Sequence, residues 1–406
     1  MRRFVSTLGL ILLAVIVFHQ GASAETYLVA PDGSGDFPSI QEAIDAVENG
    51  DIIELTNGIF QGPGNRSIDY HGKAITIRSQ HGYPTACVID LQGNHGFRFQ
   101  SGEGTASTLQ GVTITNGYRY DGGGAIYCTS SSPHIRNCHF YSNEGYTGGG
   151  GIFCDYGACP VVEDCDFLHN HSVLGGGVCC FINSSPELTN CTFRYNSAIR
   201  GGGVTCYDSS APTLTACVFS GNEAGQRGGA VHCELNCSPV FMQCTFFANS
   251  SFLYGGIYCN NLSCPALINC TFWNNRGTVC GGVYCGLYSS ATLENTIIAF
   301  SAEGSAIYCE ERGGPTLSCC DVYGNAGGDW VGCIAAQYGV DGNICEDPLF
   351  CDLLHPVIPD LRLHSDSPCA PFSPPNPECN LIGAWPVGCG DLQYADEDLG
   401  AADAVG

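Results

Sequence analysis

One motif returns at a nearly constant interval through the middle of this chain, and it limits the possible folds more than any other feature. A glycine-rich stretch followed by Ile or Val, a variable residue and Cys occurs eight times, at steps of 26 or 27 residues and a last step of 24. The cysteines that close it are Cys128, Cys154, Cys180, Cys206, Cys233, Cys259, Cys285 and Cys309. Repetition with one period is the signature of a solenoid, whose repeats stack because none can bury its apolar face alone.

A second motif, Cys-x-Phe-x-x-Asn, follows within the same units. Its aromatic position holds Phe140, Phe167, Phe193, Phe219, Phe246 and Phe272, and then Ile298 and Val322. Its last position holds Asn143, Asn170, Asn196, Asn222, Asn249, Asn275 and Asn325, with Ser301 as the exception. Two motifs that keep the same register over eight units indicate that equivalent residues lie above one another in the folded protein.

Each unit contains three short stretches in which apolar and other residues alternate, as in Ile126-x-Cys128 and Cys138-x-Phe140. Alternation of this kind is typical of short strands with one buried face, whereas the Gly and Pro of every unit exclude helices. We therefore predict an all-β, right-handed parallel β-helix with three short strands per coil of about 26 residues. Eight to eleven coils at ~4.8 Å each would form a rod roughly 40–50 Å long.

The repeated columns have different expected roles. The Phe rings should stack along the interior, and the Asn residues should take the left-handed conformation at a sharp turn while their amides bond from coil to coil. For the Cys columns we favour buried thiols over disulfides, because side chains in register point the same way. Better disulfide candidates, with connectivity left open, are Cys237, Cys264, Cys345, Cys351, Cys369, Cys379 and Cys389.

The two ends of the chain differ from the repeats. Residues 1–24 have a basic start, an apolar run and small residues at a cleavage position, which predicts a signal peptide and hence a secreted or cell-surface protein. Residues 25–117 should form an N-terminal cap with irregular first coils and a short helix that begins at Ser39 and ends at Gly50. Residues 118–326 are the regular coils, 327–389 a Cys- and Pro-rich C-terminal cap, and 390–406 an acidic disordered tail.

Composition excludes several classes of function. The formal net charge is −25 and Lys73 is the single lysine, so no nucleic-acid partner is expected. No two cysteines have C-x-x-C spacing, so we expect no metal site and no cofactor. Beyond the signal peptide no segment is long and apolar enough to suggest a transmembrane helix.

Short motifs at the ends and in the coils resemble known families. Asp32–Phe37 and Gly50-Asp51-x-Ile53-x-Leu55 are similar to the first segment of pectin-esterase and pectate-lyase-like β-helices. Gly123–Ile126 and Phe140–Asn143 resemble the paired motifs of polymorphic outer-membrane proteins. The resemblance implies a pectin-lyase-like fold, which serves both enzymes and adhesins, and the catalytic motifs of the esterases and polygalacturonases have no match here.

Three functions stay open at this point. A non-enzymatic binding protein is suggested by a column expected to point outward, whose partner would be an extracellular polysaccharide or a surface protein: Tyr127, Phe153, His232, Tyr258, Tyr284 and Tyr308. The simpler explanation, which we favour for that column, is that Tyr and Phe prefer strand positions. A polysaccharide lyase or glycoside hydrolase could use acids near the same face, namely Asp155, Asp208, Glu234, Glu310 and Glu311. A structural role in a cell envelope is the third, and we lean against an enzyme because no catalytic motif is present.

Overall fold

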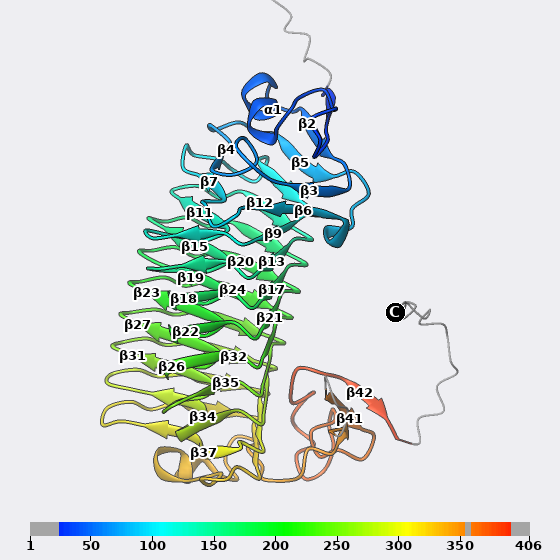
Figure 1. The fold of residues 1–406 in the computed structure, drawn as a ribbon. Coiled ribbons are helices and arrows are strands. Elements are labelled where there is room, and N and C mark those ends of the chain that lie inside the picture. Colours follow the sequence, from blue (N-terminus) through cyan, green and yellow to red (C-terminus); the bar gives the residue numbers. More distant parts are fainter. Residues whose placement is uncertain (1–23, 354–358, 391–406) are drawn as a thin grey trace, which may run out of the picture.

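The computed structural model describes residues 24–353 and 359–390, so the predicted signal peptide and acidic tail lie almost wholly outside the described residues. The chain forms a right-handed parallel β-helix, a rod of stacked coils with a smaller C-terminal segment beside its lower end (Figure 1). Three ladders of parallel strands run along the rod. The prediction of an all-β solenoid with coils of about 26 residues is confirmed.

Sheet A has twelve strands, more than the eight to eleven coils expected, because the irregular N-terminal coils join the same ladder. At ~4.8 Å per step this corresponds to about 53 Å. Its strands are β1 (Thr26–Val29), β2 (Ile52–Leu55), β5 (Thr76–Ser79), β8 (Thr108–Gln110), β12 (His134–Arg136), β16 (Val161–Glu163), β20 (Glu187–Thr189), β24 (Thr213–Thr215), β28 (Val240–Met242), β32 (Ala266–Ile268), β35 (Thr292–Glu294) and β38 (Thr316–Ser318).

Sheet B has eleven strands, and its middle residues are the Phe column. They are β3 (Gly58–Phe60), β6 (Cys87–Asp90), β9 (Thr113–Thr115), β13 (His139–Tyr141), β17 (Asp166–Leu168), β21 (Thr192–Arg194), β25 (Val218–Ser220), β29 (Thr245–Phe247), β33 (Thr271–Trp273), β36 (Ile297–Ala299) and β39 (Asp321–Tyr323). Phe167 pairs with Phe193 in register, and their parallel rings have centroids 4.7 Å apart. All six Phe rings are buried and stacked, so the predicted internal column is confirmed.

Sheet C carries the first Cys column on its inner strands. These are β4 (Ile68–Asp69), β7 (Phe97–Phe99), β11 (Ile126–Thr129), β15 (Ile152–Asp155), β19 (Val178–Cys180), β23 (Val204–Tyr207), β27 (Val231–Glu234), β31 (Ile257–Asn260), β34 (Arg276–Cys285) and β37 (Glu303–Cys309). A second row of short strands joins this sheet through β34. We call this second row the arms: β10 (Tyr118–Arg119), β14 (Glu144–Gly145), β18 (His171–Leu174), β22 (Ser197–Arg200), β26 (Glu223–Arg227) and β30 (Ser250–Ser251).

The Asn column forms a continuous amide ladder inside the rod. The Asn196 amide nitrogen donates to the Phe167 carbonyl at 2.9 Å and to Oδ1 of Asn222 at 3.0 Å, and its own Oδ1 accepts from Asn170. The predicted left-handed conformation of these asparagines is wrong. The preceding residue takes it instead, with φ of 56° at His169, because a residue at that corner can point its side chain outward while the Asn stays inside.

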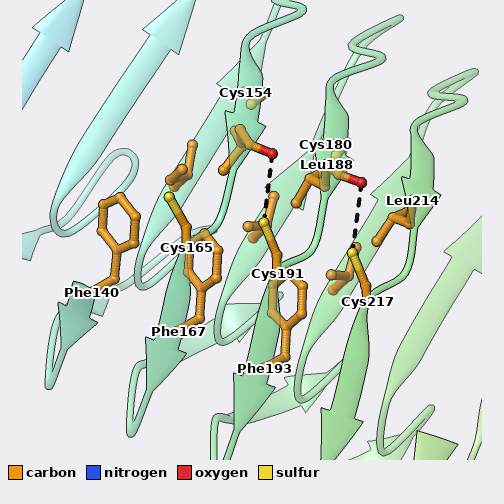
Figure 2. Packing of buried hydrophobic residues seen from close by; sticks show 14 of the residues in the cluster. Phe140, Cys154, Cys165, Phe167, Cys180, Leu188, Cys191, Phe193, Leu214 and Cys217 are labelled. Atoms are coloured by element: carbon orange, nitrogen blue, oxygen red, sulfur yellow. Dashed lines mark hydrogen bonds between the residues drawn. The ribbon is translucent and has the colours of Figure 1, made fainter. Parts of the chain in front are cut away.

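The two Cys columns are buried thiols, as predicted, with one exception. In the second column each sulfur lies near a carbonyl of the coil before it, as Cys217 Sγ does at 3.6 Å from the Leu188 oxygen (Figure 2). Thr296 occupies the same position with a hydroxyl, 3.4 Å from the Leu267 oxygen. The thiol or hydroxyl at this corner is therefore a hydrogen-bond donor to a buried carbonyl. An aliphatic side chain could not make this hydrogen bond.

The disulfides differ in part from the prediction. Cys309, at the end of the first column, is bonded to Cys333, and the other two bonds are Cys319–Cys379 and Cys351–Cys389. Four of the proposed candidates are free thiols: Cys237, Cys264, Cys345 and Cys369. Cys237 and Cys264 lie on neighbouring coils, joined by a backbone hydrogen bond of 2.8 Å, but they are one residue out of register. Cys237 is buried and Cys264 is exposed, so their side chains face opposite sides of the chain and cannot bond.

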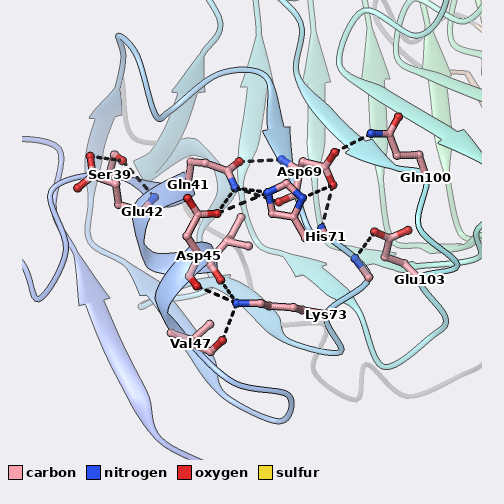
Figure 3. A network of polar contacts seen from close by, with 12 residues as sticks. Ser39, Gln41, Glu42, Asp45, Val47, Asp69, His71, Lys73, Gln100 and Glu103 are labelled. Carbon is pink, nitrogen blue, oxygen red and sulfur yellow. Dashed lines mark hydrogen bonds and ion pairs between the residues drawn. The ribbon is translucent and has the colours of Figure 1, made fainter.

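Helix α1 (Ile40–Ala46) covers the N-terminal end of the rod. Ser39 caps it as predicted, but the helix ends at Ala46, with Val47 as its C-cap, rather than at Gly50. The ammonium group of Lys73 donates to the carbonyls of Ile44, Asp45 and Val47, and so satisfies the end of the helix (Figure 3). Beside it His71 lies 3.5 Å from both Asp45 and Asp69.

The opposite end of the rod is covered by the C-terminal segment. The short helix η2 (Gly332–Gln337) and the strands β40 (Phe350–Asp352), β41 (Asp360–His364) and β42 (Val387–Cys389) belong to it. We call residues 359–390 the clasp. Leu363 and Ile382 of the clasp pack on Ile297 and Ala299, which point outward from β36, in a small apolar cluster. In the part of the chain that the structure describes, no helix has the length and hydropathy needed to cross a membrane.

Candidate functional site

The aromatic column before the Cys residues is not the open surface that was expected. Phe153, His232, Tyr258 and Tyr284 are buried, Tyr127 is half-buried, and Tyr308 is 44% exposed. The arms turn back over this column at glycines with positive φ, such as Gly201 and Gly228. The expectation of outward exposure is therefore wrong for most of the column, and binding by these six residues stays an untested prediction.

The arms place charged and aromatic side chains against the column. The Arg119 guanidinium lies 4.4 Å from the ring centroid of Tyr127, and that of Arg227 lies 5.1 Å from Tyr258. Tyr254 packs on Tyr284 with centroids 4.0 Å apart. The column is thus a second, outer core of the protein, which period-2 alternation alone cannot distinguish from an exposed row.

Two of the candidate acids on the same side, Glu234 and Asp155, make contacts within the turns. Glu234 lies 3.6 Å from Arg200 and accepts from Asn261 at 3.2 Å. Burial raises the pKa of Asp155, whose carboxylate accepts from the backbone of Tyr156. These contacts give no sign of two carboxylates facing each other across an open site.

In the part of the chain that the structure describes, two cavities lie along the outward face of sheet B. A cavity of about 570 Å³ extends from Ile59 and Asp90 to Arg194, and a second of about 390 Å³ extends from Arg194 to Trp385. Arg194 lines both, so the two cavities adjoin along the rod axis, and together we call them the groove. Its floor consists of residues next to the inward-pointing residue of each sheet B strand, as His139 and Tyr141 lie on either side of Phe140.

Three side chains with complementary charge meet in the middle of this floor. Asp166 lies 3.5 Å from Nε2 of His139 and 3.6 Å from Nη2 of Arg194, and it accepts a hydrogen bond from the Thr192 hydroxyl. They come from three successive strands, β13, β17 and β21, in register. The Nε of Arg194 is buried without a hydrogen-bond partner. The groove therefore offers an imidazole, a carboxylate and an unused donor within one short stretch.

The clasp forms one end wall of the groove. Trp385 lies over the floor and donates its indole N–H to the Thr245 hydroxyl at 2.8 Å, and the backbone N–H of Ala384 donates to Thr271 at 2.9 Å. Asp360 and Arg362 of β41 also line the groove, joined through two nitrogens at 2.7 and 2.9 Å. The hydrogen bond from Arg362 holds the pKa of Asp360 below its usual value, so this pair is charged at neutral pH.

Exposed rings follow one edge of the groove. The rings of Tyr141, His169 and Tyr195 come from consecutive coils, with centroids 6.1 and 5.5 Å apart. Tyr141 and Tyr195 are 45% and 51% exposed, and Tyr195 lies on Gly221 of the next coil. Flat faces of this kind suit the faces of sugar rings.

The groove has no set of metal ligands. Within the residues that the structure describes, no three His, Cys, Asp or Glu side chains are placed to hold an ion together. At the open end burial tends to raise the pKa of Asp90, but hydrogen bonds from Asn116 and Gln61 outweigh it and leave the pKa lowered. The available chemistry is hydrogen bonding, charge pairing and proton transfer through His139.

Sequence reasoning missed this site for a definable reason. His139 and Asp166 directly precede a Phe of the column, and Arg194 directly follows one. Because these positions point outward on successive strands, their proximity could be predicted from the register of the motif. The position of Trp385 could not be predicted in this way. The period is lost after Asn325, and nothing in the sequence shows where the last segment folds back.

The family model described as "Right handed beta helix region" matches residues 47–246 and 215–344 of this chain. The chain belongs to this right-handed β-helix family. Among solved structures, the crystal structure of pectate lyase Pel9A matches with 16% identity and a TM-score of 0.55, over 91% of this chain and 98% of that one. No curated protein matches the sequence significantly.

Two further β-helix structures match more loosely. A mannuronic acid specific polysaccharide family 6 lyase from human gut microbiota has 9% identity and a TM-score of 0.39, over 80% of this chain and 92% of that one. The PL6 family alginate lyase AlyGC has 11% identity and a TM-score of 0.40, over 80% of this chain and 54% of that one. At 16% identity the likeness to the pectate lyase is one of fold alone.

Proposed function

We propose that this protein is an extracellular polysaccharide-binding protein and that the groove on sheet B holds the glycan. The observation that carries the proposal is the alignment of the groove: its two cavities adjoin at Arg194 and together follow the rod axis, as an extended polymer would. Rings at the edge and charged groups on the floor provide both kinds of contact that sugars use. The fold shared with a pectate lyase supports the same class of ligand.

A panel of soluble polysaccharides tests the proposal, scored for binding by affinity electrophoresis and calorimetry. Tyr141→Ala and Trp385→Ala should each weaken binding about tenfold, corresponding to about 1.4 kcal/mol. Phe252→Ala is the matched control, because Phe252 is 69% exposed on the β30 arm and does not line the groove. Equal losses in all three variants, or no binding to pectate, alginate, xylan, mannan and β-glucan, would contradict the proposal.

A second candidate function is cleavage of the bound polysaccharide, which the contact between His139 and Asp166 favours. A carboxylate beside an imidazole can orient it as a general acid or base. His139→Ala would then abolish turnover while leaving binding within a few fold, and eliminative cleavage would appear as new ultraviolet absorbance. If the unaltered protein binds the polymer without shortening it, the cleavage function is contradicted and the binding function stands.

A further inference from the structure

We propose that the groove binds the end of a polysaccharide chain rather than its middle, with Trp385 of the clasp against the terminal sugar. This inference rests on the proposed function and specifies it. It follows from a difference between the two ends of the groove: one is open and the other is covered by the clasp.

The covered end begins where the floor passes under the clasp. Thr245, Thr271 and Ile297, the first residues of β29, β33 and β36, point outward but are at most 2% exposed. Gly383 lies so close to Ile297 and Thr271 that an added Cβ would come within 3.0 Å of both. The backbone of Gly383 also donates to the Asn295 carbonyl at 2.8 Å. No sugar chain can pass between the clasp and the rod there.

Within the described residues, no comparable cover lies over the opposite end. The short helix η1 (Pro84–Ala86) lies beside it: the Thr113 hydroxyl of β9 donates to the Pro84 carbonyl at 2.8 Å, and Thr113 and Thr115 are each 8% exposed. Ile59 of β3 is 57% exposed, and the outward residues Val88 and Asp90 of β6 are partly exposed. All three line the groove. A chain that begins at Trp385 can therefore run along the floor and leave past β3.

The wall is held in place by several independent attachments. Trp385 and Ala384 are hydrogen-bonded to the rod, and the Asn269 side chain donates to the Leu381 carbonyl at 2.7 Å. The Cys319–Cys379 disulfide ties the clasp covalently to the end of the rod. The clasp thus closes the groove without relying on a ligand.

The geometry also sets the length of the site. Six steps of sheet B separate β3 from β25, the last strand before β29, where Trp385 covers Thr245; this is ~29 Å at the usual strand spacing. One pyranose unit of an extended chain advances by roughly one such step. Affinity should therefore rise with oligosaccharide length and level off near six units.

The test counts protein molecules bound per glycan chain. Calorimetric titrations would use size-defined oligosaccharides of two to twelve units from pectate, alginate and xylan, together with the parent polymers of known mean length. For whichever series binds, we expect one protein per chain at every length.

Two further results complete the test. If the number of proteins bound grows in proportion to chain length, end binding is overturned while polysaccharide binding stands. If neither oligosaccharides nor polymers bind, the proposed function fails and this inference with it. Trp385→Ala should lower affinity about tenfold for six-unit chains, whereas Phe252→Ala should not, and an equal effect of both would contradict the role of the wall.

Discussion

The Asn ladder allows a prediction whose size follows from individual contacts. Asn222 is fully buried, and its amide nitrogen donates to the Phe193 carbonyl at 2.8 Å and to Oδ1 of Asn249 at 2.9 Å. Its Oδ1 accepts from the backbone and side-chain nitrogens of Asn196 at 3.1 and 3.0 Å. Asn222→Ala leaves two donors and one acceptor buried without partners, since Asn249 still accepts from the backbone of residue 222.

Each of the three unsatisfied buried groups costs about 1–3 kcal/mol, so the variant should lose about 3–9 kcal/mol of unfolding free energy. Because a solenoid is stabilised coil by coil, the weakened coil should also split the unfolding transition into two. Urea unfolding followed by circular dichroism measures both effects. Thr215→Ala, at an outward position of the same coil, is the control. A midpoint for Asn222→Ala equal to that of the control would refute the ladder as a source of stability.

Three other predictions concern stability. Burial lowers the pKa of His232 to about 3, so the unfolding free energy should fall by about 2 kcal/mol as the pH falls from 6.5 to 4.5. His232→Phe should abolish this loss, and the same loss in the variant would contradict the prediction. Burial raises the pKa of Asp321 to about 7, so the unfolding free energy should fall by about 2 kcal/mol as the pH rises from 5 to 7. Asp321→Asn should remove that dependence in urea midpoints measured at both pH values, and the same fall in the variant would contradict the prediction. Replacing Cys319 and Cys379 by Ser should lower the unfolding free energy by up to about 4 kcal/mol, because the disulfide closes a loop of 60 residues. Protease should then cleave the clasp of the variant faster than that of the unaltered protein. Equal cleavage rates would contradict the role of this disulfide in holding the clasp on the rod.

The coils show how much a repeating sequence specifies. A fixed period, an internal Phe and an internal Asn in each unit are sufficient to predict a β-helix, because stacking identical residues is the only arrangement that buries them all. Thiols along the Cys columns follow from the same register, since parallel side chains cannot face each other.

Features that depend on contacts between different parts of the coil could not be predicted. The arms that cover Tyr258 and Tyr284 begin as glycine-rich turns, and nothing in their sequence says that they fold back over the strand rather than away from it. The clasp reaches sheet B from more than a hundred residues away, as the contact between Trp385 and Thr245 shows. The arms fold back over the aromatic column and bury it, and the clasp folds back onto sheet B and forms the end of the groove. Both features therefore depend on where distant segments of the chain pack.

Fluorescence of Trp385 tests the central claim most directly. The chain has three tryptophans, so a Trp273→Phe, Trp330→Phe variant reports on the groove wall alone. Titration with the six-unit oligosaccharide that binds best should change its emission in parallel with binding measured by calorimetry. Full binding with no change in Trp385 emission and no protection from a soluble quencher would show that the glycan lies elsewhere on the molecule.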